Sequence, residues 1–191
     1  MRFVLRLLMS IAVALAVGFG LSYYVLTDGR MFGAVTLGPW TTWPDIGSPN
    51  PNPYTSGHIT REAALQLGRS EGLRFVATTD SDGDSLDLSC TYRLDGHVPV
   101  STFWTLAAVD PQWINLAAPG TDAALRSSEV IRASDGALRV RIGTTLQPGT
   151  WLELAGAGPF SLVLTLYDTT ALSSFAAANT TMPSITREAC T

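Results

Sequence analysis

The chain has 191 residues and a net charge of −4, and only 15% of its residues are charged, against about 25% in typical soluble domains. Every basic side chain is an arginine, because the sequence contains no lysine. The length suits one domain with appendages, and the acidic balance excludes the clustered basic footprint of a nucleic-acid-binding protein. We therefore expect no nucleic acid among the partners.

Residues 7–26, LLMSIAVALAVGFGLSYYVL, carry no charge. A helix of this length rises about 30 Å, which matches the hydrocarbon core of a bilayer. Arg2 and Arg6 precede it, which favours a cytoplasmic N-terminus and a periplasmic remainder of the chain. We expect residues 1–26 to be an uncleaved signal-anchor that crosses the inner (plasma) membrane once and contacts lipid through residues 7–26. The alternative is a signal peptide cleaved at Ala14–Ala16.

Residues 27–53 are predicted to be a connector, because they are rich in proline and glycine, which exclude a regular helix. The segment also contains Trp40 and Trp43. Two interpretations remain open. The segment is a simple tether between membrane and domain, or its tryptophans dock on the domain or at the lipid headgroups, where indoles prefer to lie.

Short helices are predicted at two places outside the strands. One or two helical turns are expected from Pro53 to about Arg61, with Asn52 or Thr55 as the N-cap. Another short helix is expected in the tail at Ala171–Ala178.

Residues 54–191 are predicted to form an antiparallel β-sandwich, because apolar residues alternate with polar ones from Leu67 onward. The strand from Phe160 to Asp168 has one apolar face, and its other face (Val163, Thr165 and Tyr167) is only half polar, so this strand is expected to be central. Asp-Gly pairs, which favour type I′ hairpin turns, occur between or beside the strands at 82–83, 95–96 and 135–136. The predicted inward-facing residues are Leu73, Phe75, Ala77, Leu86, Leu88, Cys90, Tyr92, Leu94, Leu138, Val140, Ile142, Phe160, Leu162, Leu164 and Leu166.

Cys90 and Cys190 are the only cysteines. In an exported protein an even pair is typical of a disulfide, which here would fasten the tail to the strand that carries Cys90. The other interpretation is two free thiols in a redox or metal site. No histidine or third cysteine lies within C-x-x-C spacing, which favours the disulfide.

A candidate ligand face comprises arginines and tryptophans. Arg93, Arg139 and Arg141 would form an anion site if their strands are neighbours, because arginine suits bidentate recognition of carboxylate or phosphate. Trp104, Trp113 and Trp151 would line a cleft for a sugar or an apolar ligand. The plainer interpretations are a solvated sheet face for the arginines and buried core positions for the tryptophans.

Known catalytic motifs are missing from the sequence. There is no G-x-S-x-G elbow, no Walker loop and no dinucleotide fingerprint after a strand. The acidic run Asp80–Asp87 does not fit the EF-hand register, which needs glycine at position six and glutamate at position twelve. A solvated hairpin turn is the preferred interpretation of this run, and a calcium site in another kind of acidic turn is the alternative. We therefore assign no catalytic residue and expect neither a metal nor a cofactor.

Several segments occur together in a fixed order: DSDGDSL, YRL, VPVSTFWTLAAVD, SDGALRVRIG, GTWLEL and PFSLVLTLYD. Over about residues 70–168 this order resembles the family called domain of unknown function 1214. The similarity is greatest to short, membrane-anchored members from α-proteobacteria, which share counterparts of Gly38, Trp40, Pro53, Tyr54, Met182, Pro183, Ile185 and Cys190.

The resemblance implies a jelly-roll-like sandwich and a companion, the domain of unknown function 1254, fused or encoded nearby. It implies no catalytic residues. One position departs from the family pattern. Thr165 stands where the family often has an arginine before its final Leu-Tyr, so any ligand role of that arginine is in doubt in this chain.

The sequence is compatible with two functions. The leading one is a non-catalytic envelope module that binds a protein partner or a glycan. The alternative is a small periplasmic, hydrolase-like enzyme with a carboxylate and aromatic cleft on the sandwich. A cleft with apolar walls that holds two close carboxylates, or arginine with carboxylate, would favour the enzyme. A flat or filled sandwich would favour the binding module.

Overall fold

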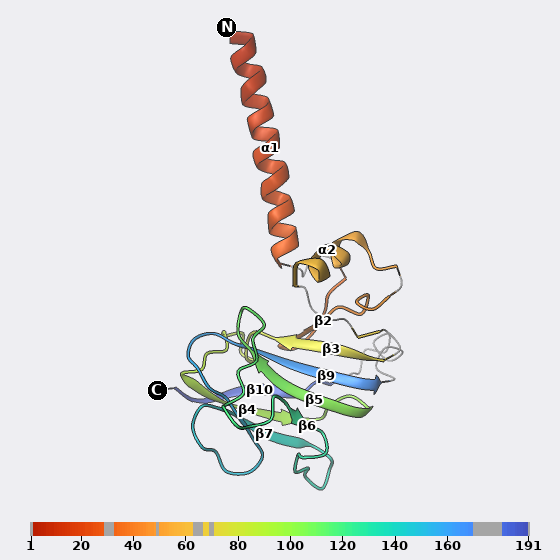
Figure 1. Cartoon of the computed structure of the whole chain (residues 1–191), viewed down its shortest axis with the longest axis vertical. Helices are drawn as coiled ribbons and strands as arrows, with labels where there is room; N and C mark the ends of the chain where they lie inside the picture. The colour runs from red at the N-terminus through yellow and green to blue at the C-terminus, as the bar shows by residue number, and fades with distance from the viewer. Residues whose placement is uncertain are drawn as a thin grey trace.

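The computed structural model describes residues 2–28, 33–48, 50–62, 67–68, 71–169 and 181–190. It contains two helices, α1 (Arg2–Asp28) and α2 (Pro53–Glu62), and two β-sheets (Figure 1). The strands are β1 (Val35–Leu37), β2 (Trp40–Thr42), β3 (Gly72–Ala77), β4 (Cys90–Gly96), β5 (Ser101–Val109), β6 (Leu125–Arg126), β7 (Leu138–Gly143), β8 (Trp151–Glu153), β9 (Ser161–Thr169) and β10 (Ser184–Cys190).

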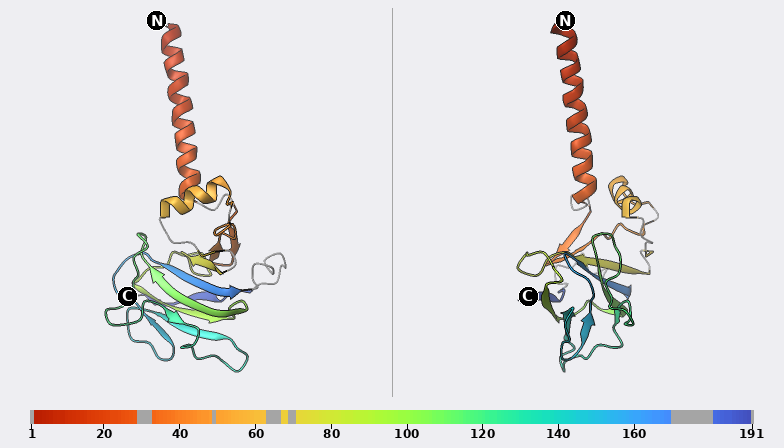
Figure 2. Two further views of the ribbon diagram at one scale, coloured as in Figure 1. Left: turned by 45° about the vertical axis from the view of Figure 1, so that its right-hand side comes forward. Right: turned by 60° about the vertical axis from the view of Figure 1, so that its left-hand side comes forward.

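Helix α1 extends away from the β-sheets as a single rod (Figures 1 and 2). Its segment Arg2–Tyr24 has a mean hydropathy of 2.2 and is exposed along its length, so it is long and apolar enough to cross a membrane. Such a helix is consistent with a membrane anchor or with a signal sequence. The expected apolar span, residues 7–26, lies inside α1.

The two sheets form a sandwich, which confirms the predicted fold class. The first sheet has the order β1-β2-β3-β9-β5-β6, and the second has the order β10-β4-β7-β8. Every strand pair is antiparallel except β7 with β8, which is parallel. The chain crosses between the sheets repeatedly, as a jelly-roll-like sandwich requires. Strand β9 lies between β3 and β5, which confirms the central position predicted from its half-polar second face.

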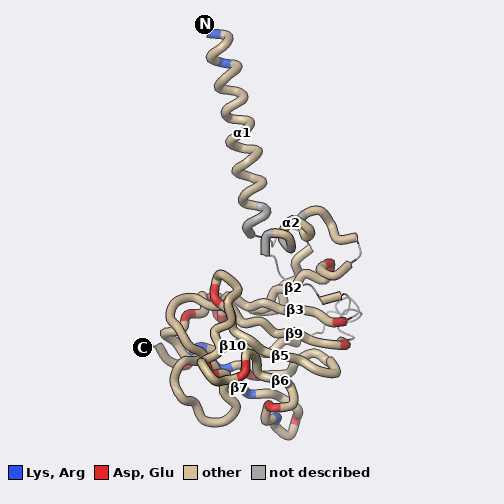
Figure 3. The backbone as a smooth tube through the Cα atoms, in the orientation of Figure 1, with Lys and Arg blue, Asp and Glu red and all other residues tan. Residues whose placement is uncertain are grey.

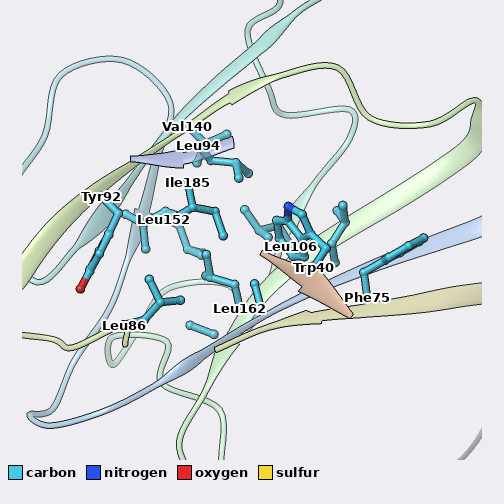
Figure 4. Packing of buried hydrophobic residues seen from close by; sticks show 14 of the residues in the cluster. Trp40, Phe75, Leu86, Tyr92, Leu94, Leu106, Val140, Leu152, Leu162 and Ile185 are labelled. Carbon is cyan, nitrogen blue, oxygen red and sulfur yellow. The ribbon is translucent and has the colours of Figure 1, made fainter. Parts of the chain in front are cut away.

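The core fills the space between the two sheets, and all the predicted inward-facing residues are buried in it. Figure 4 shows Tyr92, Leu94 and Val140 from the second sheet in the same core as Leu106 and Leu162 from the first. Leu86 and Leu88 are buried before β4 begins, in a stretch that bridges only to Pro159. The alternation therefore predicted burial there correctly but extended the strand too far.

The segment expected to be a connector contributes β1 and β2 to the edge of the first sheet. Trp40 has an exposed fraction of 0% and belongs to the core. Its indole N–H donates a 2.7 Å hydrogen bond to the Pro183 carbonyl. Of the two interpretations left open, docking on the domain is correct for Trp40, because its ring is buried in the core next to the C-terminal segment.

The Asp-Gly pairs do not form type I′ turns. That turn needs positive φ at both central residues, but only the glycines have it, with φ of 95° at Gly83 and 84° at Gly136. In both cases the glycine is the last residue of a four-residue β-turn, in which its N–H donates a hydrogen bond to the carbonyl of the residue three positions earlier. Asp95 and Gly96 are the last residues of β4 rather than a separate turn.

Helix α2 confirms the predicted helix after the connector. The Asn52 side-chain oxygen accepts a 2.9 Å hydrogen bond from the Thr55 N–H, so Asn52 is the N-cap. The tail helix expected at Ala171–Ala178 lies outside the described residues.

Candidate ligand-binding face

The outer face of the second sheet brings together four of the five candidate ligand residues. Arg93 in β4 lies directly opposite Arg141 in β7, and Asp95 lies opposite Arg139. In β8, Trp151 is the register partner of Arg141. These side chains point outward because alternate residues in the same strands, such as Leu94 and Val140, point into the core.

Two carboxylates hold these arginines in one network. Asp95 accepts a 3.1 Å hydrogen bond from Arg139 Nε and lies 3.0 Å from its Nη2, while Arg93 Nε lies 3.7 Å away. Glu188 accepts a 3.1 Å bond from Arg93 Nη1 and lies 3.6 Å from Arg141 Nε. Each carboxylate is thus shared by two guanidinium groups, and the face carries one more positive charge than negative.

The network is only partly shielded from water. The Arg139 side chain is 68% exposed and that of Arg141 is 30% exposed. Ion pairs at such positions contribute little to folding stability, typically about 0–1 kcal/mol each. Among the described residues, the ε-nitrogens of Arg93 and Arg141 are buried without a hydrogen-bond partner. The ion pairs of these arginines therefore contribute little to the folding stability of the domain.

An open cleft of about 580 Å³ lies beside the arginines. Its floor includes Arg139 and Arg141, and its walls come from the segments 131–137 and 148–150. The walls are fixed to each other and to the sheet. Arg141 Nη1 donates a 3.0 Å bond to the Pro148 carbonyl, and the Ile131 N–H donates a 3.2 Å bond to Thr150 Oγ1. Figure 3 shows the basic residues near β10 and β7.

Several residues of the cleft were not anticipated from the sequence. Arg132 and Asp135 line it, and Ile131, which is 71% exposed, forms part of its apolar wall. A single antiparallel bridge between Arg132 and Leu138, on either side of the turn at Ala133–Gly136, places Arg132 there. The Asp-Gly pair between Ile131 and Arg139 does indicate a turn. The residues before that turn are not in a regular strand, so periodicity cannot predict which way their side chains point.

The tryptophans divide between this face and other positions. Trp151 is half-buried, and its indole N–H donates a 3.2 Å bond to the Gly143 carbonyl, which holds the ring beside Arg141. Trp104 is only 3% exposed and lies in the core against the first sheet. It cannot belong to the same face, because the residues that point outward from β5 are its neighbours in sequence, such as Phe103 and Thr105.

The expected disulfide joins Cys90 and Cys190. The two residues are direct partners across β4 and β10. A register shift between Arg187 and Ala189 precedes the disulfide, and Glu188 lies within that irregularity. The disulfide therefore fixes the end of the strand that supplies Glu188 to the arginines.

The described part of this face offers guanidinium groups, which suit carboxylate or phosphate, and its carboxylates already have partners within the protein. Asp95 is already shared by two arginines, and Asp135 Oδ1 accepts a 3.0 Å bond from the Ala137 N–H within its turn. In the part of the chain that the structure describes, no three His, Cys, Asp or Glu side chains come close enough to hold a metal ion. Asp87 lies away from the cleft, just before β4. Hydrogen bonds from Ser89 lower the pKa of its carboxyl group.

Comparisons with known proteins agree with the fold. A family model described as "Protein of unknown function (DUF1214)" matches residues 71–171, just over half of the chain. The VPA0106 protein from Vibrio parahaemolyticus has a similar structure, with a TM-score of 0.58 and 16% identity, over 74% of this chain and 36% of its own.

An uncharacterised protein from Burkholderia cenocepacia is also similar, with a TM-score of 0.49 and 14% identity, over 88% of this chain and 39% of its own. The chain thus spans little more than a third of the length of either solved protein. No curated protein matches the sequence. At 16% identity the similarity to the Vibrio protein shows the fold alone.

Proposed function

This chain belongs to the DUF1214 family, and from that premise we propose that its β-sandwich is a non-catalytic binding module of the bacterial envelope, held at the inner membrane by α1. One observation carries the proposal. Arg93, Arg139 and Arg141 meet on one exposed sheet face beside an open cleft. Guanidinium groups recognise carboxylate and phosphate in a bidentate manner, so the ligand is an anionic group on an envelope protein or an envelope glycan.

A location in the periplasm is supported by two independent features. Arg2 and Arg6 stand before the apolar part of α1, which favours a cytoplasmic N-terminus. The Cys90–Cys190 disulfide on the other side of that helix suits an oxidising compartment. The length of α1 favours an uncleaved anchor, because secretory signal peptides have shorter apolar regions.

The family resemblance suggests a class of protein partner. Members often accompany the domain of unknown function 1254, so a protein similar to that companion is the first candidate. Carboxylates on an acidic surface of that protein would replace Asp95 and Glu188 as the ion-pair partners of the arginines. Such an exchange costs little in the free module, because the internal ion pairs are partly exposed.

The enzyme hypothesis has one feature in its favour, since arginine and carboxylate do meet at this cleft, in Arg139 and Asp95. However, both carboxylates of the cleft have structural roles. Asp95 pairs with arginines, and Asp135 closes a turn. A general acid or base must contact the substrate to exchange a proton with it, and both carboxylates are already engaged by groups of the protein. Binding is therefore the better supported function.

The proposal is tested with the full chain in lipid nanodiscs. Wild-type protein and the variant R139E/R141E are used in parallel to capture partners from an envelope extract and to bind a panel of acidic envelope glycans. We expect the wild type to retain a specific protein or glycan, and the variant to bind it at least about tenfold more weakly, which corresponds to about 1.4 kcal/mol.

The matched control is R126E. Arg126 is also partly exposed and paired with acidic residues, but it lies in β6 of the first sheet. A wild-type protein that retains neither a protein nor a glycan contradicts the proposal. So does a cleft variant that retains as much ligand as R126E, because the arginine face would then not be the binding surface.

A further inference from the structure

A second surface lies on the outer side of the first sheet, opposite the arginine face. Trp43 and Ile46 from the segment after β2 and Trp113 from the loop after β5 pack there over Arg74 and Val76 of β3. The hollow between them has a volume of only about 30 Å³, which is room for about one water molecule. These tryptophans therefore form a nearly filled apolar surface and not a ligand pocket.

The loop after β5 is held in a defined shape by Asp110. Its Oδ1 accepts 2.8 Å hydrogen bonds from the N–H groups of Gln112 and Ile114, and its own N–H donates to the Ile114 carbonyl. Trp113 has a φ of 63°, in the left-handed region that non-glycine residues rarely adopt. The loop accepts this backbone strain and leaves Ile114 63% exposed. Ile114 thus lies at the surface next to the partly exposed Trp113, in a loop whose backbone is fixed by Asp110.

The length of the chain after α1 limits how far this surface can lie from the membrane. Helix α1 ends at Asp28, and β1 begins at Val35, seven residues later. Seven residues span at most about 25 Å even when fully extended. Figures 1 and 2 show α1, α2 and the green loop after β5 on the same side of the sandwich, while β4 and β7 lie on the other side.

We propose that Trp43, Ile46, Trp113 and Ile114, together called the tryptophan patch, rest on the lipid headgroup layer of the membrane that α1 crosses. The occupant is a bilayer interface because indole rings prefer that layer, where their apolar body and polar N–H are both satisfied. The short tether delivers the patch to that layer. The docked domain then presents the arginine face away from the membrane, toward soluble or wall-bound partners.

The proposal rests on the anchoring part of the proposed function, and it is tested by placing a fluorescent label on each side of the sandwich. Both native cysteines are in the disulfide, so an added cysteine is the single reactive thiol. The full chains I114C and L146C are labelled with NBD and placed in nanodiscs of phosphatidylethanolamine and phosphatidylglycerol. Leu146 is the matched control, because it is also an exposed aliphatic residue in a loop, with an exposed fraction of 83%.

The label at position 114 is expected to emit at shorter wavelength than the label at position 146, and to be quenched when the lipids carry brominated acyl chains. A second measurement uses tryptophan emission without any label. Brominated lipids should quench wild type and W151F equally, and the double variant W43F/W113F should lose that quenching, because the remaining tryptophans are in the core or on the distal face.

Equal emission and equal quenching at positions 114 and 146 would overturn the proposal. So would protection of position 114 that persists in detergent without lipid and depends on protein concentration, because the patch would then bind a second copy of the chain. Recovery of the protein in nanodiscs reports insertion of α1 separately. A failure of anchoring is therefore distinguishable from a failure of the tryptophan patch to contact lipid.

Discussion

Removing the disulfide by the double substitution C90A/C190A is expected to lower the free energy of unfolding by about 2–4 kcal/mol. The bridge closes a loop with a sequence separation of 100 residues. In the chain-entropy model, a loop of that size restricts the unfolded chain by about 4.7 kcal/mol at 25 °C. The measured effect should be smaller, because real unfolded chains retain structure that already limits their freedom.

The native state itself should change little when the bridge is removed. Strand β10 keeps its ladder with β4, Ile185 remains fully buried, and Arg187 remains paired with Asp80 at 3.2 Å. The loss of stability therefore arises mainly in the unfolded state. Because of this, hydrogen exchange in β10 should stay slow in the variant under conditions where the domain is folded.

The assay is urea unfolding of the full chain in detergent micelles, followed by tryptophan emission. The double variant is compared with the oxidised wild type, and reduced wild type serves as the control for side-chain changes. If the double variant and the reduced wild type both unfold within about 0.5 kcal/mol of the oxidised protein, the entropic reasoning is refuted. Fast exchange confined to β10 would instead mean that the bridge acts locally.

Three further substitutions follow from single contacts. Trp40→Phe should cost about 1–3 kcal/mol in urea unfolding, because the buried Pro183 carbonyl loses its donor; an unchanged midpoint would mean that the bond is dispensable. Gly72→Ala should cost at least about 1–3 kcal/mol by the same assay, because its Cβ would overlap the Leu166 carbonyl; a neutral result would contradict the close approach of β3 and β9. Asp87 is held below its usual pKa of 3.8 by hydrogen bonds, so its folded state binds a proton less readily and its contribution is lost as pH falls through the folded pKa. The unfolding midpoint of D87N should therefore fall less steeply than that of wild type below pH 3.8, and parallel acid profiles would exclude this role.

Alternation in the sequence predicted the sandwich because each long strand has one face in the core. Leu94 and Val140 could be assigned inward without knowing which strands are neighbours. Trp104 could not be assigned in this way, because both faces of β5 are substantially apolar. Trp40 lies in a strand of three residues, which is too short for any period to appear.

The arginine face was predictable only in part, for a related reason. Arg93, Arg139 and Arg141 occupy outward positions in regular strands, so their common face follows from the pairing of β4 with β7. Glu188 reaches the face through an irregularity in β10, and such a shift changes which side of the strand a residue occupies. The cleft depends on irregular loops, whose packing leaves no periodic trace in the sequence.

The hydrogen bond from Trp40 to Pro183 also has a mechanical consequence. If α1 is held in a membrane and a partner pulls on the domain, as proposed, the force enters the first sheet through β1, which begins at Val35. Among the described strands, β1 pairs with β2 alone, so its hydrogen bonds can break one at a time. Trp40 is the next point of resistance, because moving it requires the core to open and the C-terminal tail to lose its clamp. We therefore expect β1 to detach at low force, and further unfolding to need the higher force that removes Trp40 from the core.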